Sequence, residues 1–185
     1  MAVLSGSDRR SILRLGWSAL LCVAFAVDAV AQIGEYQVKA AFLYNFAKFV
    51  EWPASSFPKP SDPIVICILG QNPFDDSLSE AIRGKLWEGR AFTILQIAEL
   101  PPKSRCQILF VNSSERQRFR SMAASLKGSG ILTVGDTPGF LDDGGIINFK
   151  LEDGKIRFDI NVEAAGQAHL TVSSKLLNLA QTVKR

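Results

Sequence analysis

Few side chains in this 185-residue sequence have the types and spacing that catalysis or metal binding needs. His169 is the single histidine, which excludes a metal site with several histidines and makes any Ser-His-Asp triad depend on one residue. Its neighbours Ala168 and Leu170 are apolar, which is typical of a packed or surface histidine. We therefore predict no catalytic residue, no metal site and no cofactor, and we expect that the protein is not an enzyme.

Three short motifs look like functional signatures but lack the context that those signatures require. Gly128-Ser129-Gly130 falls between an expected helix and an expected strand, whereas a dinucleotide-binding loop connects a strand to a following helix. Asp142-Asp143-Gly144-Gly145 lacks the alternating oxygen ligands of a calcium loop, and Ser173-Ser174-Lys175 lacks the Ser-x-x-Lys spacing. We interpret the three motifs as a helix stop, a turn and a helix cap.

The composition is that of one ordinary globular domain. Hydrophobic residues make up 47% of the chain and charged residues 21%, and 21 Lys+Arg against 18 Asp+Glu give a net charge of +3. A nucleic-acid-binding protein would cluster its basic residues along one face. We see no such cluster in the sequence and expect no nucleic-acid partner.

The N-terminal segment has the three parts of a signal peptide. Arg9-Arg10 and Arg14 provide a basic region, Leu15 to Val27 is apolar, and Ala29-Val30-Ala31 places small residues at a cleavage site. A membrane anchor would need about 20 apolar residues, and Asp28 ends the run before that length.

We therefore predict a signal peptide over residues 1–31, cleavage after Ala31, and a mature domain over 32–185 without a membrane anchor of its own. The expected location is the periplasm. The paired arginines also fit a twin-arginine signal, so the export route stays open.

The mature chain begins with a helix, predicted from Glu35 to Val50, that is apolar around most of its circumference. Val38, Phe42, Phe46 and Phe49 recur at helical spacing, and the Trp-Pro dipeptide that follows ends the helix. One side of a sheet normally covers less apolar surface than this helix presents. We therefore expect a homodimer in which a second copy covers the remainder.

Strands and helices alternate along the rest of the chain. Ile64 to Leu69 is a continuous apolar run, typical of a strand buried on both faces, and Glu152-Asp153-Gly154 predicts a turn between two antiparallel strands, Gly145–Leu151 and Lys155–Asn161. We predict an α/β fold: a single three-layer domain with a mixed, largely parallel sheet flanked by helices and a C-terminal antiparallel hairpin. The other expected elements are helices over Asp75–Arg83, from Ser113 or Ser114 to Lys127, over Val162–Ala168 and after Ser173 or Ser174, and strands over Ala91–Ile97, Cys106–Val111 and Ile131–Val134.

Two cysteines, Cys67 and Cys106, remain after the predicted cleavage. In an oxidising compartment an even pair is typical of a disulfide, and closing a loop of about 40 residues would stabilise the fold by roughly 4 kcal/mol. Two buried free thiols are the alternative.

Two blocks of the sequence resemble the YfiR family of periplasmic proteins. The first is Lys39 to Pro53, KAAFLYNFAKFVEWP, and the second lies in the C-terminal third. Cys67 and Cys106 fall where relatives carry a disulfide pair, whereas the second pair that some relatives have near the hairpin is missing from this sequence. The second block consists of Gly145–Phe149, Ile156–Asn161, Ala164-Ala165, and Leu170 running into Ser173–Leu177.

The resemblance implies a regulator that acts by binding. Members of this family repress an inner-membrane diguanylate cyclase by binding its periplasmic portion, and they thereby lower the level of cyclic-di-GMP. For this chain we expect the contact surface at Asn161, Glu163, His169 and Leu170, where a charged residue, a histidine and exposed apolar groups share one short segment. The alternative is that this segment is an ordinary amphipathic helix that covers the sheet.

A second class of function stays open. In a small-molecule sensor, acting on another membrane signalling protein such as a histidine kinase, Tyr44, Trp52, Phe57 and Trp87 would line a pocket. Aromatic side chains at such positions are more often part of the core.

Overall fold

An eight-stranded sheet runs through the chain in the order β10-β8-β7-β6-β5-β2-β4-β3. Neighbouring strands from β4 through β2, β5 and β6 to β7 are parallel, and so are β8 and β10, whereas β3–β4 and β7–β8 are antiparallel. A separate antiparallel pair joins β1 to β9. The strands are β1 Val50–Glu51, β2 Ile64–Leu69, β3 Leu86–Trp87, β4 Arg90–Ile97, β5 Ile108–Val111, β6 Leu132–Gly135, β7 Ile147–Glu152, β8 Lys155–Asn161, β9 Thr171–Val172 and β10 Thr182–Lys184.

The computed structural model describes residues 34–100 and 105–185, so the predicted signal peptide and its cleavage site after Ala31 lie outside the described residues. An N-terminal helix covers residues 34–49. The other helices are η1 Ala54–Ser56, α2 Ser77–Ile82, η2 Ser113–Glu115, α3 Arg116–Met122, η3 Ala123–Leu126, α4 Val162–Gln167 and α5 Ser174–Leu177.

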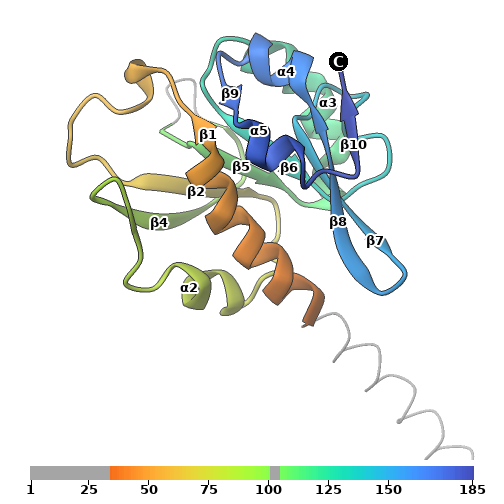
Figure 1. Cartoon of the computed structure of the whole chain (residues 1–185), viewed down its shortest axis with the longest axis horizontal. Coiled ribbons are helices and arrows are strands. Elements are labelled where there is room, and N and C mark those ends of the chain that lie inside the picture. The colour runs from red at the N-terminus through yellow and green to blue at the C-terminus, as the bar shows by residue number, and fades with distance from the viewer. Residues whose placement is uncertain (1–33, 101–104) are drawn as a thin grey trace, which may run out of the picture. The chain divides into compact units, whose positions relative to one another are not determined.

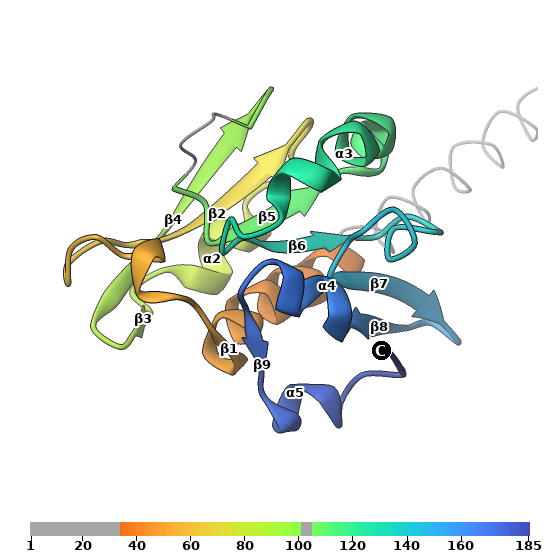
Figure 2. The same ribbon diagram turned by 90° about the horizontal axis from the view of Figure 1, so that it is seen from above.

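Helices cover both faces of the sheet (Figure 1). The N-terminal helix and α2 lie on one face and α3 lies on the other (Figure 2). Strand β2 shows how the sequence produces the two layers, because successive side chains of a strand point to opposite faces. Ile64, Ile66 and Ile68 enter one hydrophobic core, and Cys67 and Leu69 enter the other. The predicted α/β fold, with a mostly parallel sheet and an antiparallel hairpin, is confirmed.

The N-terminal helix is largely covered by its own domain. Leu43 and Phe46 are fully buried, and the Phe46 ring packs on Phe149 at 5.6 Å and on Phe158 at 5.2 Å between ring centroids. Val38, 44% exposed, is the large apolar side chain of this helix that stays outside. This helix therefore leaves less apolar surface for a second copy to cover than the sequence indicated. The homodimer stays a prediction, and light scattering can test it.

Several boundaries differ from the predicted ones. Val50 leaves the helix and pairs with Val172 of β9, and Cys106 precedes strand β5 instead of lying in it. The helix expected from Ser113 or Ser114 to Lys127 consists of η2, α3 and η3 in succession. The short strands β1, β3, β9 and β10 were not predicted, because runs of two or three residues carry no measurable alternation.

Candidate functional site

Helix α4 contains the segment in which we expected partner contacts, and Asn161 fixes its beginning. The Asn161 side-chain oxygen accepts a hydrogen bond from the Ala164 N–H at 2.9 Å, and its amide donates to the Leu141 carbonyl at 3.2 Å. The residue is only 5% exposed. Asn161 therefore caps and positions α4, as an N-cap asparagine does, and it does not offer a side chain to a partner.

The Gly128-Ser129-Gly130 loop fixes the other end of α4. The Gly128 N–H donates to the Gln167 carbonyl at 2.7 Å, and the Gly130 N–H donates to the Ala168 carbonyl at 3.0 Å. Carbonyls at a helix C-terminus have no partner within the helix, so this loop supplies the donors that they lack. The motif is thus part of the frame that holds α4.

The sequence segment around His169 is divided between surface and core. Glu163 and His169 are exposed. Leu170 is 5% exposed and belongs to the larger hydrophobic core, so the expectation that its apolar side chain is accessible to a partner is wrong. The turn that follows α4 aims residue 169 outward and residue 170 inward, which single-sequence patterning did not show.

His169 has a backbone conformation that is uncommon for residues other than glycine. Its φ is +61°, in the left-handed region, where a side chain other than glycine costs about 1–2 kcal/mol. The imidazole lies beside Gly128, where an added Cβ would be 3.5 Å from the His169 Cε1. A residue that keeps a strained conformation on the surface is a candidate for function.

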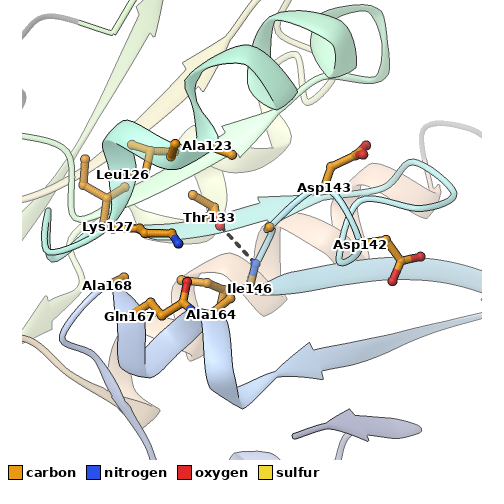
Figure 3. A pocket seen from close by; sticks show the side chains of 13 residues that line it. Ala123, Leu126, Lys127, Thr133, Asp142, Asp143, Ile146, Ala164, Gln167 and Ala168 are labelled. Atoms are coloured by element: carbon orange, nitrogen blue, oxygen red, sulfur yellow. Dashed lines mark hydrogen bonds between the residues drawn. The ribbon is translucent and has the colours of Figure 1, made fainter.

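A hollow of about 280 Å³ opens beside α4 (Figure 3). Its lining comes from η3, the loop after it, strand β6, the loop before β7, and α4 with the residue that follows it. Two acidic residues of the lining are already paired: Asp143 with Arg116 at 2.7 Å and Asp142 with Lys184 at 2.7 Å. The Lys184 ammonium lowers the pKa of Asp142 below its ordinary value, first through the hydrogen bond and then through its charge.

A second hollow, of about 370 Å³, contains three of the four aromatic residues that we expected in a pocket. Trp52, Phe57 and Trp87 line it, together with Lys48 and Arg90 among others. The Trp52 indole is held by a hydrogen bond to the Gln107 carbonyl at 3.2 Å, and the Arg90 guanidinium lies 4.1 Å from the centre of the Phe57 ring.

Tyr44 lies outside the lining of this second hollow. Its ring packs edge-on against Phe92 at 5.3 Å between centroids, with the ammonium groups of Lys48 and Lys85 over it. For Tyr44 these contacts support the alternative of a packing role.

A disulfide joins Cys67 in β2 to Cys106 just before β5, with 5.7 Å between the two Cα atoms. The connection from β4 to β5 contains no helix in its described parts, residues 98–100 and 105–107. The disulfide attaches the end of this connection to the buried strand β2, within the hydrophobic core that also contains Phe119 of α3. Its place indicates a structural role.

Sequence reasoning missed a buried ion pair between the N-terminal helix and Asp136, the residue that follows β6. The Lys39 ammonium donates to the Asp136 carboxylate at 2.8 Å, with side chains 4% and 7% exposed, and the Tyr36 hydroxyl donates to the same oxygen at 3.0 Å. The available signal was a lysine among apolar positions of an otherwise apolar helix. Nothing in the sequence pointed to Asp136 as its partner.

Within the described ranges, no group of three or more His, Cys, Asp or Glu side chains is placed to hold a metal ion. The same residues include no helix that is long and apolar enough to cross a membrane.

Comparison with known proteins identifies one family. No curated protein matches the sequence. The YfiR/HmsC-like family matches residues 36–181, which covers most of the chain and includes both blocks of resemblance, the disulfide and α4. The chain therefore belongs to the YfiR/HmsC-like family.

Proposed function

We propose that this protein is a periplasmic regulator that binds the periplasmic portion of an inner-membrane diguanylate cyclase, represses it and thereby lowers cyclic-di-GMP. The observation that carries the proposal is the family match over residues 36–181. YfiR-like proteins are regulatory proteins of the periplasm that act on membrane cyclases. A homodimer is compatible with this role.

A regulator of this kind acts only by preferring one state of its partner. A preference of about 3 kcal/mol for the inactive cyclase would change the ratio of active to inactive cyclase roughly a hundredfold. Such a preference needs a surface whose shape does not change, because ordering a flexible surface on binding costs free energy. Helix α4 meets this need, since hydrogen bonds fix it at both ends.

The experiment that tests the proposal is deletion of the gene, with measurement of cellular cyclic-di-GMP by mass spectrometry. We expect the nucleotide to rise, and to fall again when the intact exported protein is restored. The protein purified from the periplasm should also bind the periplasmic domain of one of the cell's membrane cyclases. Unchanged cyclic-di-GMP, together with no binding to any such domain, would refute the function.

Glu163 tests whether α4 carries the contact. Its carboxylate is exposed and accepts a hydrogen bond from the Gln167 side chain at 3.1 Å, so Glu163→Ala should change the free energy of unfolding by no more than about 0.5 kcal/mol. We expect weaker cyclase binding with an unchanged melting temperature. Glu80→Ala, an exposed glutamate of α2, is the matched control and should bind normally.

The second hollow supports a small-molecule sensor as the second candidate function. Its volume of about 370 Å³ lies within the range of about 300–1,000 Å³ that is usual for small-molecule sites. Binding next to two indoles would change the tryptophan fluorescence, so the protein can be screened against a panel of small metabolites. A change that disappears in Trp87→Ala would support this function, and an unchanged emission across the panel would count against it.

A further inference from the structure

The hollow beside α4 has a buried floor and an exposed mouth. Ile131, Thr133 and Ile146 are 3%, 2% and 2% exposed and belong to the floor, whereas Lys127 and Gln167 lie at the solvent. Its volume of about 280 Å³ falls below the usual range of about 300–1,000 Å³ for sites that enclose a whole small molecule. A single side chain of another protein is the better fit.

The hollow has a mixed lining, in which small apolar residues face each other across part of the space and polar or charged residues line the rest. Ala164 of α4 and Ala168, which follows the helix, form the lower wall, and Ala123 of η3 lies in the upper wall, with Ile146 between them (Figure 3). Such walls leave space that a larger apolar side chain can fill, with loss of water from both surfaces. Interfaces gain most of their binding energy from a few side chains that fill pockets of this kind.

The charge of the hollow is uneven. Asp143 is paired with Arg116 and lies 3.6 Å from Arg120, and Asp142 is paired with Lys184. The Lys127 side chain reaches between the upper and lower walls (Figure 3). Among the residues that the structure describes, its ammonium has no ion-pair or hydrogen-bond partner. The uncompensated charge at the mouth is therefore positive, and the complementary group is a carboxylate.

We propose that the hollow beside α4 is the socket for one apolar side chain of the partner protein, and that an acidic residue next to that side chain pairs with Lys127. This inference rests on the proposed function, because it names the chemistry of the cyclase segment that docks on α4. The occupant is a protein segment that presents an apolar side chain beside an Asp or Glu. The socket is preorganised, since Asn161 and the Gly128-Ser129-Gly130 loop fix its lower wall.

Two variants test the socket. The measurement is the affinity for the purified periplasmic domain of the membrane cyclase that the wild-type protein binds. Ala164→Leu fills the hollow from within, and Lys127→Glu reverses the charge at its mouth. We expect each to raise the Kd about tenfold or more, a loss in the range seen when an important interface side chain is removed. Raising the salt concentration should weaken wild-type binding more than binding of Lys127→Ala, because screening acts on the exposed ion pair.

Matched controls separate the socket from general effects. Ala41→Leu enlarges an exposed alanine of the N-terminal helix, and Lys155→Glu reverses an exposed lysine at the start of β8. Both variants should bind like the wild type. Thermal melting of these four variants shows whether they fold. If Ala164→Leu does not fold, Lys127→Glu alone tests the socket.

Two failures are distinguishable. If deletion of the gene leaves cyclic-di-GMP unchanged and the wild-type protein binds no cyclase domain, the proposed function is refuted and the socket with it. If the wild type binds and folded Lys127→Glu and Ala164→Leu bind equally well, the function stands and the socket is refuted. In that case Glu163→Ala shows whether the outer face of α4 carries the contact instead.

Discussion

The Lys39–Asp136 pair allows a sharp test of what holds the N-terminal helix on the sheet. Lys39→Met removes the ammonium but keeps most of the apolar stem. The Asp136 carboxylate, whose side chain is 7% exposed, then retains the Tyr36 hydroxyl at 3.0 Å but loses the lysine charge. A buried charge that loses its partner destabilises a fold by about 3–5 kcal/mol.

The double variant Lys39→Met/Asp136→Leu should recover most of this loss. Replacing both members of a buried ion pair by apolar residues of similar volume is often close to neutral. The Tyr36 hydroxyl loses its acceptor, but the residue is only partly buried and the hydroxyl can bond to water. The two substitutions should therefore be strongly non-additive, with an interaction energy of at least about 2 kcal/mol.

Urea unfolding of the wild type, the two single variants and the double variant gives the four free energies of the cycle. A loss of 3 kcal/mol would lower the melting temperature of a chain of this size by about 6–12 °C. If each single variant loses less than about 1 kcal/mol and the losses add, the pair is solvated in solution and the reasoning is wrong.

Three further predictions concern the disulfide, the strained histidine and the exposed ion pair. Mass spectrometry of non-reduced peptides from periplasm-purified protein should show Cys67 linked to Cys106, and two free thiols would contradict the predicted bond. The double variant Cys67→Ala/Cys106→Ala should have a free energy of unfolding lower by up to roughly 4 kcal/mol, because the bond closes a loop of 39 residues. His169→Gly should keep the wild-type melting temperature to within a few degrees, since relief of the left-handed strain offsets the greater entropy of an unfolded glycine. The same variant should weaken cyclase binding. Asp153→Gly, which relieves a similar φ of +50° in the hairpin turn, is the control and should leave cyclase binding unchanged. Because Lys184 lowers the pKa of Asp142 below 3.8, this ion pair stabilises the fold above about pH 4, and the stabilisation is lost as the pH falls through the lowered pKa. In Lys184→Ala, an NMR titration should show the Asp142 pKa return toward 3.8. An unchanged pKa would show that the pair does not form.

Much of the fold was predictable because its long elements carry clear periodicity. The N-terminal helix, β2, β4 and the β7–β8 hairpin appear within one or two residues of the predicted ranges. The caps were also predictable from residue type: Asn161 caps α4, and Ser173 caps α5 by accepting a hydrogen bond from the Leu176 N–H. In each case the information lies within a few residues of the element itself.

The site was less predictable because it depends on residues that are far apart in the sequence. The orientation of Leu170 toward the core and of His169 toward solvent follows from the turn after α4, and the two share the same short sequence segment. The socket combines η3, β6, two loops and α4. The residue types and spacing of any one of these segments do not predict that the others lie beside it. Pairing across such distances is a property of tertiary structure.

Gly128 offers a test of how α4 is held that does not depend on any partner. Helix α4 has six residues, too few for a stable helix on its own, so its order comes either from the hydrogen bonds at its ends or from the core packing of Ala165. Gly128→Ala keeps its N–H but forces a Cβ onto a residue with φ of +73°, at a cost of about 1–2 kcal/mol. Gly154→Ala in the hairpin turn imposes the same backbone cost at φ of +69°, with no atom within 4 Å of the new Cβ.

The two variants should therefore lose similar stability but differ in where the loss appears. In Gly128→Ala the N–H groups of Ala168 and Leu170, which bond to carbonyls of α4 at 3.0 and 2.9 Å, should exchange with solvent faster than in Gly154→Ala. Hydrogen exchange measured by NMR at equal global stability makes the comparison. Equal exchange at these two amides in both variants would mean that the core packing of Ala165 and Leu170 holds α4 in place. The hydrogen bonds from the glycine loop would then contribute nothing to the order of the helix.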